Sequence, residues 1–397
     1  MAQHATLQLA APTPGSSAGL PPIEAILRGT WHDTPDGPVF VRDEWYPLDH
    51  LHGAVPVDAP LTVHLDGLSH LLGGATPPDP SRLAFFDIET TGLSGGTGTY
   101  VVIAGLGSFE DNGYRLRQYF LAEMEHERAM LAMLSEDLAR FDGIVTYNGR
   151  TFDLPFLQTR MTLARLRFPC DHLAHFDLLH PVRRLYKHRM RGCRLAEAER
   201  KLLRIERLDD ISGALIPALY FDYVRAGRAA PLRAVFRHNA DDVLSLGGIL
   251  AKLARLLVRD DLDPDDAAAV ARWWEAERQP ERAVPLYRYA LPWLEGGDDW
   301  AWAAGRHAAL CKRLGARDEA LPLWKELWRQ GDRRAGLELA KHYEHHARDL
   351  DAAERLAAGL LAGCPEADAQ ALGVRVARIR SKRARADASR CPQRRDR

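Results

Sequence analysis

The placement of strand-like and helix-like segments constrains this chain most. Short apolar runs typical of buried strands occur only before about residue 260. From residue 264 onward the sequence is rich in Ala, Arg and Trp, and its apolar residues have helical spacing. With 397 residues the chain is long enough for two or three domains. We therefore expect an α/β domain followed by an all-α domain.

The α/β part has the pattern of a mixed sheet. Asp111-Asn112-Gly113 is a tight-turn signal between two strand-like runs. The later runs alternate with amphipathic helical segments, which is typical of strands joined by crossovers. The expected strands are 83–88, 100–108, 114–121, 143–147 and 172–177. We predict a five-stranded mixed sheet flanked by helices and completed by a long helix over about 232–257.

Composition and patterning divide the chain into five regions. The N-terminus is rich in Ala, Pro, Gly and Ser, and Asp36-Gly37 lies between apolar runs as in a small hairpin. The last residues are strongly basic, which is typical of a solvated, disordered tail and less often of a nucleic-acid-binding arm. The expected regions are a disordered leader at 1–22, a small segment with a hairpin at 23–80, the α/β domain at 81–260, helical repeats at 264–365 and a basic tail at 374–397.

The helical part contains three similar segments. They carry Ala283, Ala320 and Ala353 at a separation of roughly the 34 residues of a tetratricopeptide unit. Ala308, Leu310 and Leu314, and likewise Leu339, Ala340 and Tyr343, are then expected on the partner helices. The alternative is an irregular helical bundle with coincidental spacing.

Bulk composition excludes several classes of protein. The 53 basic and 54 acidic residues give a net charge of -1, which argues neither for nor against a polyanionic partner. The five cysteines form no CxxC pair, so neither a zinc knuckle nor a disulfide framework is indicated. No secretory signal and no apolar run of about 18–20 residues is present. We expect a cytoplasmic protein without a membrane partner.

Two carboxylates lie inside the first apolar run. Asp87 and Glu89 are two residues apart in Phe86-Asp87-Ile88-Glu89, so on a strand they face the same side. Two such carboxylates repel each other unless a cation or a proton lies between them, and oxygen ligands suit Mg²⁺ or Mn²⁺. The alternative is a pair of charges at an exposed strand end.

Two more segments carry candidate polar groups. Asn148 and Asp153 follow a predicted strand where a helix begins, although Asp153 there could serve only as a helix cap and Asn148 only as a turn residue. His238 and Asp242 are four residues apart on the last long helix and share one face. A surface His–Asp pair is the alternative.

These residues, in this order, resemble the DEDD exonucleases. Asp87-Ile88-Glu89-Thr90-Thr91-Gly92-Leu93 resembles the first motif of that family, Asn148 to Asp153 the second, and the His238–Asp242 helix the third. More closely, the chain resembles bacterial ribonuclease-H-like proteins that carry C-terminal tetratricopeptide-like repeats. The likeness covers about 80–260 well and 265–360 loosely. It departs at His238, which has the spacing of the family's tyrosine type instead of its histidine type.

The resemblance implies a ribonuclease-H-like fold and a two-metal 3′→5′ exonuclease acting on DNA or RNA ends. It implies that Asp87, Glu89, Asp153 and Asp242 bind two divalent ions, Mg²⁺ or Mn²⁺. His238 becomes a candidate general base, and the repeats a candidate site for a protein partner. Candidate substrate-binding residues are Thr90, Thr91, Gly92, Leu93, Asn148 and Phe152. A structure-specific endonuclease and a scaffold with a weak or inactive nuclease fold stay open as alternatives.

Overall fold

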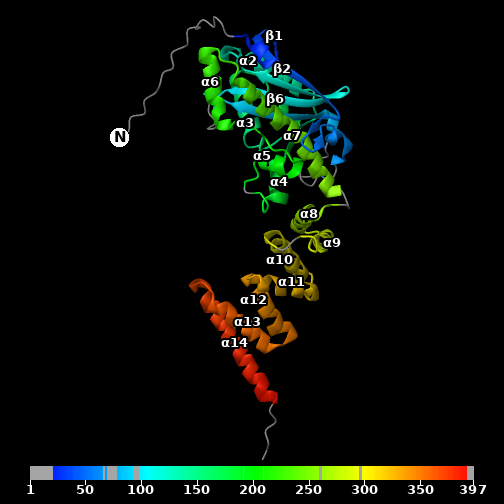
Figure 1. Ribbon diagram of the computed structural model, residues 1–397, viewed down its shortest axis with the longest axis vertical. Coiled ribbons are helices and arrows are strands. Elements are labelled where there is room, and N and C mark those ends of the chain that lie inside the picture. Colours follow the sequence, from blue (N-terminus) through cyan, green and yellow to red (C-terminus); the bar gives the residue numbers. More distant parts are fainter. Residues whose placement is uncertain are drawn as a thin grey trace, which may run out of the picture. The chain divides into compact units, whose positions relative to one another are not determined.

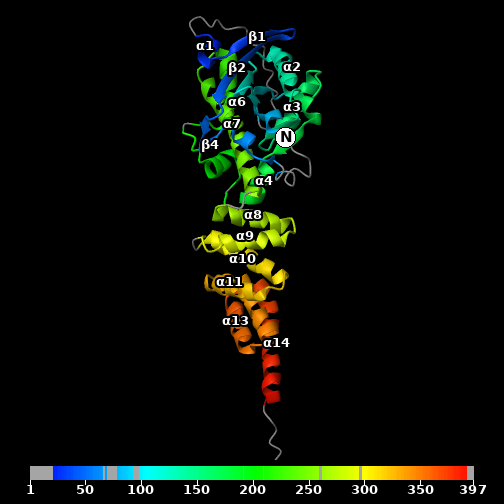
Figure 2. The same cartoon turned by 90° about the vertical axis from the view of Figure 1, so that its right-hand side faces the viewer.

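The computed structural model describes residues 21–65, 68, 78–92, 98–190, 192–208, 210–258, 262–294 and 297–390. They belong to two compact units, Met1–Arg259 and Asp260–Arg397, shown in Figures 1 and 2. Apart from Pro21 and Pro22, the expected leader lies outside the described residues.

A seven-stranded mixed sheet in the order β1-β2-β7-β6-β5-β8-β9 forms the centre of the first unit. Pairing is antiparallel from β1 through β5 and parallel between β5, β8 and β9. The strands are β1 (Thr30–Thr34), β2 (Gly37–Pro47), β5 (Leu83–Thr90), β6 (Val101–Glu110), β7 (Gly113–Phe120), β8 (Gly143–Thr146) and β9 (Ala174–Asp177), beside a small separate hairpin of β3 (Leu51–His52) and β4 (Val55–Pro56). The five predicted strands and the mixed sheet are confirmed.

The predicted number of strands was wrong, because the sheet continues into the N-terminal segment. The hairpin expected at Asp36-Gly37 is present as β1 and β2. Its second strand then pairs antiparallel with β7, with Phe40 opposite Phe120. Val39, Phe40 and Val41 are buried there, so the pairing removes apolar surface from water and covers an edge that β7 would otherwise expose.

Helices cover both faces of this sheet. Phe86 and Ile88 of β5 belong to a core with the apolar sides of α2 and α3, whereas Phe40 and Phe120 pack with α1, α6 and the start of α7. The helices of this unit are α1 (Ile23–Leu27), α2 (Glu127–Leu138), α3 (Asp153–Leu163), α4 (Leu179–Tyr186), α5 (Leu195–Ala198) with a π-turn at Glu199–Leu203, α6 (Ile216–Ala226) and α7 (Leu232–Val258), with short 3₁₀ turns at Ala59–Thr62, Pro80–Arg82, Met124–His126, Pro169–His172 and Gly213–Leu215.

The described part of the second unit is helical, as predicted. Ala283, Ala320 and Ala353 lie on α9, α11 and α13 and are fully buried. Of the residues expected to face them, Leu314 is exposed instead, because it follows the end of α10. The helices are α8 (Pro264–Ala276), α9 (Pro280–Ala290), α10 (Asp298–Arg313), α11 (Arg317–Arg329), α12 (Arg333–His342) with a π-turn at Tyr343–Ala347, α13 (Leu350–Ala362) and α14 (Glu366–Arg390).

The expected disordered tail was largely wrong, because residues up to Arg390 continue α14. Val376 and Ile379 are buried against Ala353 and Ala357 of α13. Several basic side chains of the helix have an ionic partner, since Arg375, Arg378 and Lys382 all pair with the buried Glu344. The remainder of the expected tail, 391–397, lies outside the described residues. Across the described chain, no helix is both long and apolar enough to span a membrane.

The packing of α14 can be tested by truncating one buried side chain. We expect Ile379→Ala to destabilise the α13–α14 pair by about 2–5 kcal/mol, because it leaves a cavity under a fully buried residue. Val374→Ala, at a position 63% exposed on the same helix, is the matched control. Amide hydrogen exchange of α13 and α14 measures the effect, and equal protection in the two variants would contradict the buried position of Ile379.

Candidate metal centre

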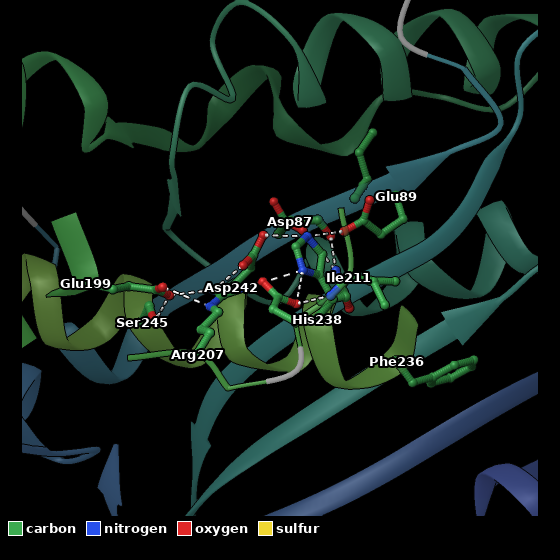
Figure 3. A network of polar contacts seen from close by, with 12 residues as sticks. Asp87, Glu89, Glu199, Arg207, Ile211, Phe236, His238, Asp242 and Ser245 are labelled. Carbon is green, nitrogen blue, oxygen red and sulfur yellow. Dashed lines mark hydrogen bonds and ion pairs between the residues drawn. The ribbon is translucent and has the colours of Figure 1, made fainter. Parts of the chain in front are cut away.

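Two carboxylates lie side by side on the central strand. Asp87 and Glu89 are two residues apart on β5, so both point to the same side of the sheet (Figure 3). The β5–β6 register shifts between Glu89 and Thr90, where the strand ends. The Glu89 side chain is only 13% exposed. The alternative of a solvent-exposed pair at a strand end is therefore wrong.

A third carboxylate reaches the same strand from α3. Asp153 is the first residue of that helix and is buried. Its Oδ1 accepts a hydrogen bond of 3.2 Å from the backbone N–H of Ile88, between the two β5 carboxylates. The side chain therefore contacts β5 directly, which the role of a helix cap does not require.

The loop before α3 is held by Asp177, at the end of β9. Its carboxylate accepts hydrogen bonds from the N–H groups of Asn148 (2.8 Å), Arg150 (3.1 Å) and Leu179 (3.1 Å). Asn148 has a positive φ of 69°, a conformation that Asn tolerates better than most residues. These contacts give Asn148 a turn role and fix the path of the chain into Asp153.

The long helix α7 supplies a histidine and a fourth carboxylate. His238 Nε2 lies 3.6 Å from Glu89 Oε1 and 3.8 Å from Asp242 Oδ2, as Figure 3 shows. Potential ligand atoms of Glu89, His238 and Asp242 all lie within 4.8 Å of one another, which is close enough to hold one metal ion. Asp87 and Asp153 adjoin this trio but do not belong to it.

A buried asparagine links α7 to Asp87. Asn239 Nδ2 donates to Asp87 Oδ2 at 3.0 Å, and Asn239 Oδ1 accepts from Gln118 Nε2 at 2.9 Å. Both amides are fully buried. Gly105 lies opposite Asp87 in the β5–β6 register, and a Cβ there would come within 2.4 Å of Asn239 Oδ1. The glycine therefore provides the space that Asn239 occupies.

Arg207 is the cation of this network. It ion-pairs with Asp242, and its Nε donates to Glu199 Oε2 at 2.8 Å (Figure 3). Its Nη1 also lies 3.2 Å from Asp210 Oδ2. The same aspartate holds His238, since Asp210 Oδ1 lies 2.7 Å from His238 Nδ1.

Sequence reasoning did not place Arg207, Asp210, Glu199 or Asn239 in the site. Arg207 and Asp210 lie in an irregular segment, where no periodicity indicates the direction of a side chain. The available signal was the position of Asn239 directly beside His238.

Burial and mutual repulsion raise the pKa values of three carboxyl groups. The pKa of Asp87 is well above its ordinary value because of burial and the charges of Asp242, Asp153 and Glu89. Burial and the charges of Asp242 and Asp153 also raise the pKa of Glu89, which Arg207 partly offsets. For Asp153, burial raises the pKa to about 7 despite the stabilising Ile88 N–H.

The site carries more negative than positive charge, and this excess indicates whether its residues fit a metal ion. Among the described residues, Arg207 is the one cation among the leading influences on the pKa of Glu89, and no cation is among the leading influences on the pKa of Asp87. The oxygen-rich donor set, with one imidazole, suits a hard divalent ion such as Mg²⁺ or Mn²⁺. Such a charge would remove the repulsion, so these residues fit divalent metal.

The residues expected to bind substrate have different surroundings in the structure. Thr90 Oγ1 donates to the carbonyl of Gly92 at 2.8 Å, and Thr91 Oγ1 accepts from Tyr100 N–H at 2.9 Å, so both hydroxyls shape the loop after β5. Phe152, directly before Asp153, stacks on Phe156, which belongs to the core. Leu93 lies outside the described residues.

Comparison with known proteins agrees with this fold. Residues 84–254 match the sequence profile of the RNase_H superfamily. The chain is also 34% identical over 359 residues to the uncharacterized protein YprB of Bacillus subtilis (strain 168), covering 86% of each chain.

The raised pKa values predict how stability depends on pH when metal is removed. Between the ordinary pKa of 3.8 and about 7, folded Asp153 binds more protons than unfolded Asp153. In EDTA, its contribution to the free energy of unfolding is therefore present at low pH and is lost as the pH rises through this window. We expect Asp153→Asn, which keeps an oxygen that can accept from Ile88 N–H, to reduce this pH-dependent loss of stability.

Urea unfolding of the metal-free protein at about pH 5 and about pH 7.5 measures the effect. The exposed Asp33→Asn on β1 is the control and should retain the full pH dependence. A wild-type stability that stays constant or increases over this interval would contradict the assignment.

Proposed function

We propose, since this chain carries an RNase_H superfamily domain and belongs to the same family as Bacillus subtilis YprB, that it is a metal-dependent phosphodiester hydrolase. The finer proposal is a 3′→5′ exonuclease acting on single-stranded DNA or RNA ends. The observation that carries it is the meeting of Asp87, Glu89, Asp153 and Asp242, which come from three distant segments, with His238 beside Glu89 and Asp242.

The carboxylates would hold the metal, and the supporting residues fix their positions. Asp87 and Glu89 are held by β5, Asp242 by Arg207, and the Asp87 carboxylate is oriented by Asn239. Divalent ions bound there would lower the pKa of a water molecule and stabilise charge on the phosphate and the leaving oxygen.

His238 is positioned to accept a proton near this centre. With Nδ1 protonated and hydrogen-bonded to Asp210, its Nε2 would be a free acceptor that faces Glu89 and Asp242. This arrangement suits a general base that takes the proton of an attacking water. It supports His238 in that role although its sequence spacing departs from the histidine-type pattern.

The helical unit supports a second part of the proposal, a surface for a protein partner. Its helices contact one another in sequence, α8 with α9, α10 with α11, and α12 with α13. The buried Ala283, Ala320 and Ala353 take matching places in the second helix of each pair. We propose that these pairs are tetratricopeptide-like repeats.

The hydrolase is tested with 5′-labelled single-stranded DNA and RNA, with and without a blocked 3′ end, in Mg²⁺ or Mn²⁺. We expect stepwise shortening from the free 3′ end. Asp87→Asn should reduce the rate about a hundredfold or more, because metal ions supply several kcal/mol of stabilisation.

The control for this assay is Asp33→Asn, which should match the wild type. Internal cleavage regardless of the 3′ block would replace the exonuclease with an endonuclease. Equal activity in wild type and Asp87→Asn, or none in either, would overturn the hydrolase.

The proposed general-base role of His238 predicts a loss of activity that does not depend on metal binding. We expect His238→Gln to lower kcat by about 10²–10⁴-fold, the usual contribution of a positioned base. Asp210→Asn should lower kcat less, since an amide oxygen can still accept a hydrogen bond from His238 Nδ1 and can still lie beside Arg207. Rates at saturating substrate, measured across Mn²⁺ concentrations, distinguish the loss of a general base from the loss of a metal ligand. A His238→Gln defect cured by more Mn²⁺ would identify His238 as a metal ligand instead.

A further inference from the structure

Apart from the metal centre, a cleft of about 520 Å³ is lined by residues of α1, β2 and α7 in the first unit. This volume is within the range of small-molecule sites. The face of α7 that lines it carries Phe236, Arg237, Ala240 and Asp241, whereas His238 and Asp242 face the carboxylates. Figure 3 shows Phe236 apart from the cluster along the helix. The cleft is therefore distinct from the metal centre.

Positive charge predominates in the cleft. It is lined by Arg28, Arg42, Arg233 and Arg237 against two carboxylates, Glu44 and Asp241. The Glu44 carboxylate is already engaged, since it ion-pairs with Arg42 and accepts a hydrogen bond of 2.8 Å from the Tyr46 hydroxyl. The lining therefore has a net excess of two positive charges.

Two of the arginines have unused donors. Among the described residues, the Arg28 side chain has no hydrogen-bond or ion-pair partner, and it is exposed. Arg233 Nε donates to the backbone carbonyl of Ile26 at 3.0 Å, which anchors the side chain and leaves its two terminal nitrogens for a ligand. A guanidinium presented in this way matches the paired oxygens of a phosphate.

A chain of buried and partly buried hydrogen bonds joins this cleft to the metal centre. Arg42 Nη1 donates to Gln118 Oε1 at 3.1 Å, and Gln118 Nε2 donates to Asn239 Oδ1 at 2.9 Å. Asn239 in turn donates to Asp87 Oδ2 at 3.0 Å. A ligand that rearranges Arg42 would therefore act on the side chain that orients Asp87.

We propose that the cleft between α1, β2 and α7 binds the phosphate group of a nucleotide or of a nucleic-acid strand. Arg28 and Arg233 provide the open guanidinium groups, and Arg42 connects the site to Asp87. The binding itself does not depend on the proposed hydrolysis.

The test measures binding of AMP and of an eight-nucleotide single-stranded DNA to the full chain by calorimetry in EDTA. Without metal, the carboxylates of the metal centre repel phosphate, so this condition isolates the cleft. We expect Arg28→Gln/Arg233→Gln to weaken binding at least about tenfold, because hydrogen bonds to charged groups are lost.

Arg225→Gln is the matched control, since Arg225 Nε also donates to a backbone carbonyl, that of Phe221, at 3.1 Å. Circular dichroism checks folding, and Arg28→Gln alone, at an exposed position, keeps the test valid if loss of the Arg233–Ile26 contact destabilises the double variant. Arginine-dependent binding of AMP identifies a nucleotide phosphate, and arginine-dependent binding of the oligonucleotide alone identifies a strand; either supports the site.

The inference is overturned if wild-type protein binds neither probe, or if the arginine variants bind as tightly as the wild type and Arg225→Gln. These outcomes do not depend on nuclease activity. A result that rules out phosphate binding in the cleft is therefore distinguishable from one that rules out the proposed hydrolase activity.

Discussion

The repulsion among buried carboxylates is the constraint around which the first unit is organised. Asp87, Glu89 and Asp153 are removed from water and lie near Asp242, so each raises the cost of ionising the others. The surrounding fold holds them in place through the central strand β5, the buried amide of Asn239 and the Glu199–Arg207–Asp242 ion pairs. Such an arrangement is costly unless a positive charge joins it, which is why a metal centre accounts for it best.

The sequence predicted the order of elements well because each element has a local signature. Apolar runs, the Asp111-Asn112-Gly113 turn and helical periodicity are all readable within a short window. The partner of a strand is not readable in this way. The hairpin of β1 and β2 was expected, but its pairing with β7 depends on residues about 80 positions apart, such as Phe40 and Phe120. Likewise, the arginines of α14 suggested disorder, while the compensating charge of Glu344 lies about 30 residues earlier.

The same distinction between local and long-range signals applies to the residues of the site. Asp87 and Glu89 on a strand, and His238 and Asp242 on a helix, could be placed on common faces from their spacing alone. Arg207 and Asp210 could not, because an irregular segment has no period from which to infer direction. The fully buried Gln118 carried no sequence signal either, since its role depends on Arg42 and Asn239 together.

The addition of β2 to the sheet has a practical consequence for dissecting this protein. The superfamily match begins at residue 84, whereas the folded sheet begins at Thr30. A fragment cut at the match would expose the backbone of β7 along its whole length and so invite association between molecules. It would also lose Arg42, which contacts Gln118. The segment that matches the superfamily is thus smaller than the unit that can be expected to fold, and useful expression boundaries should follow the latter.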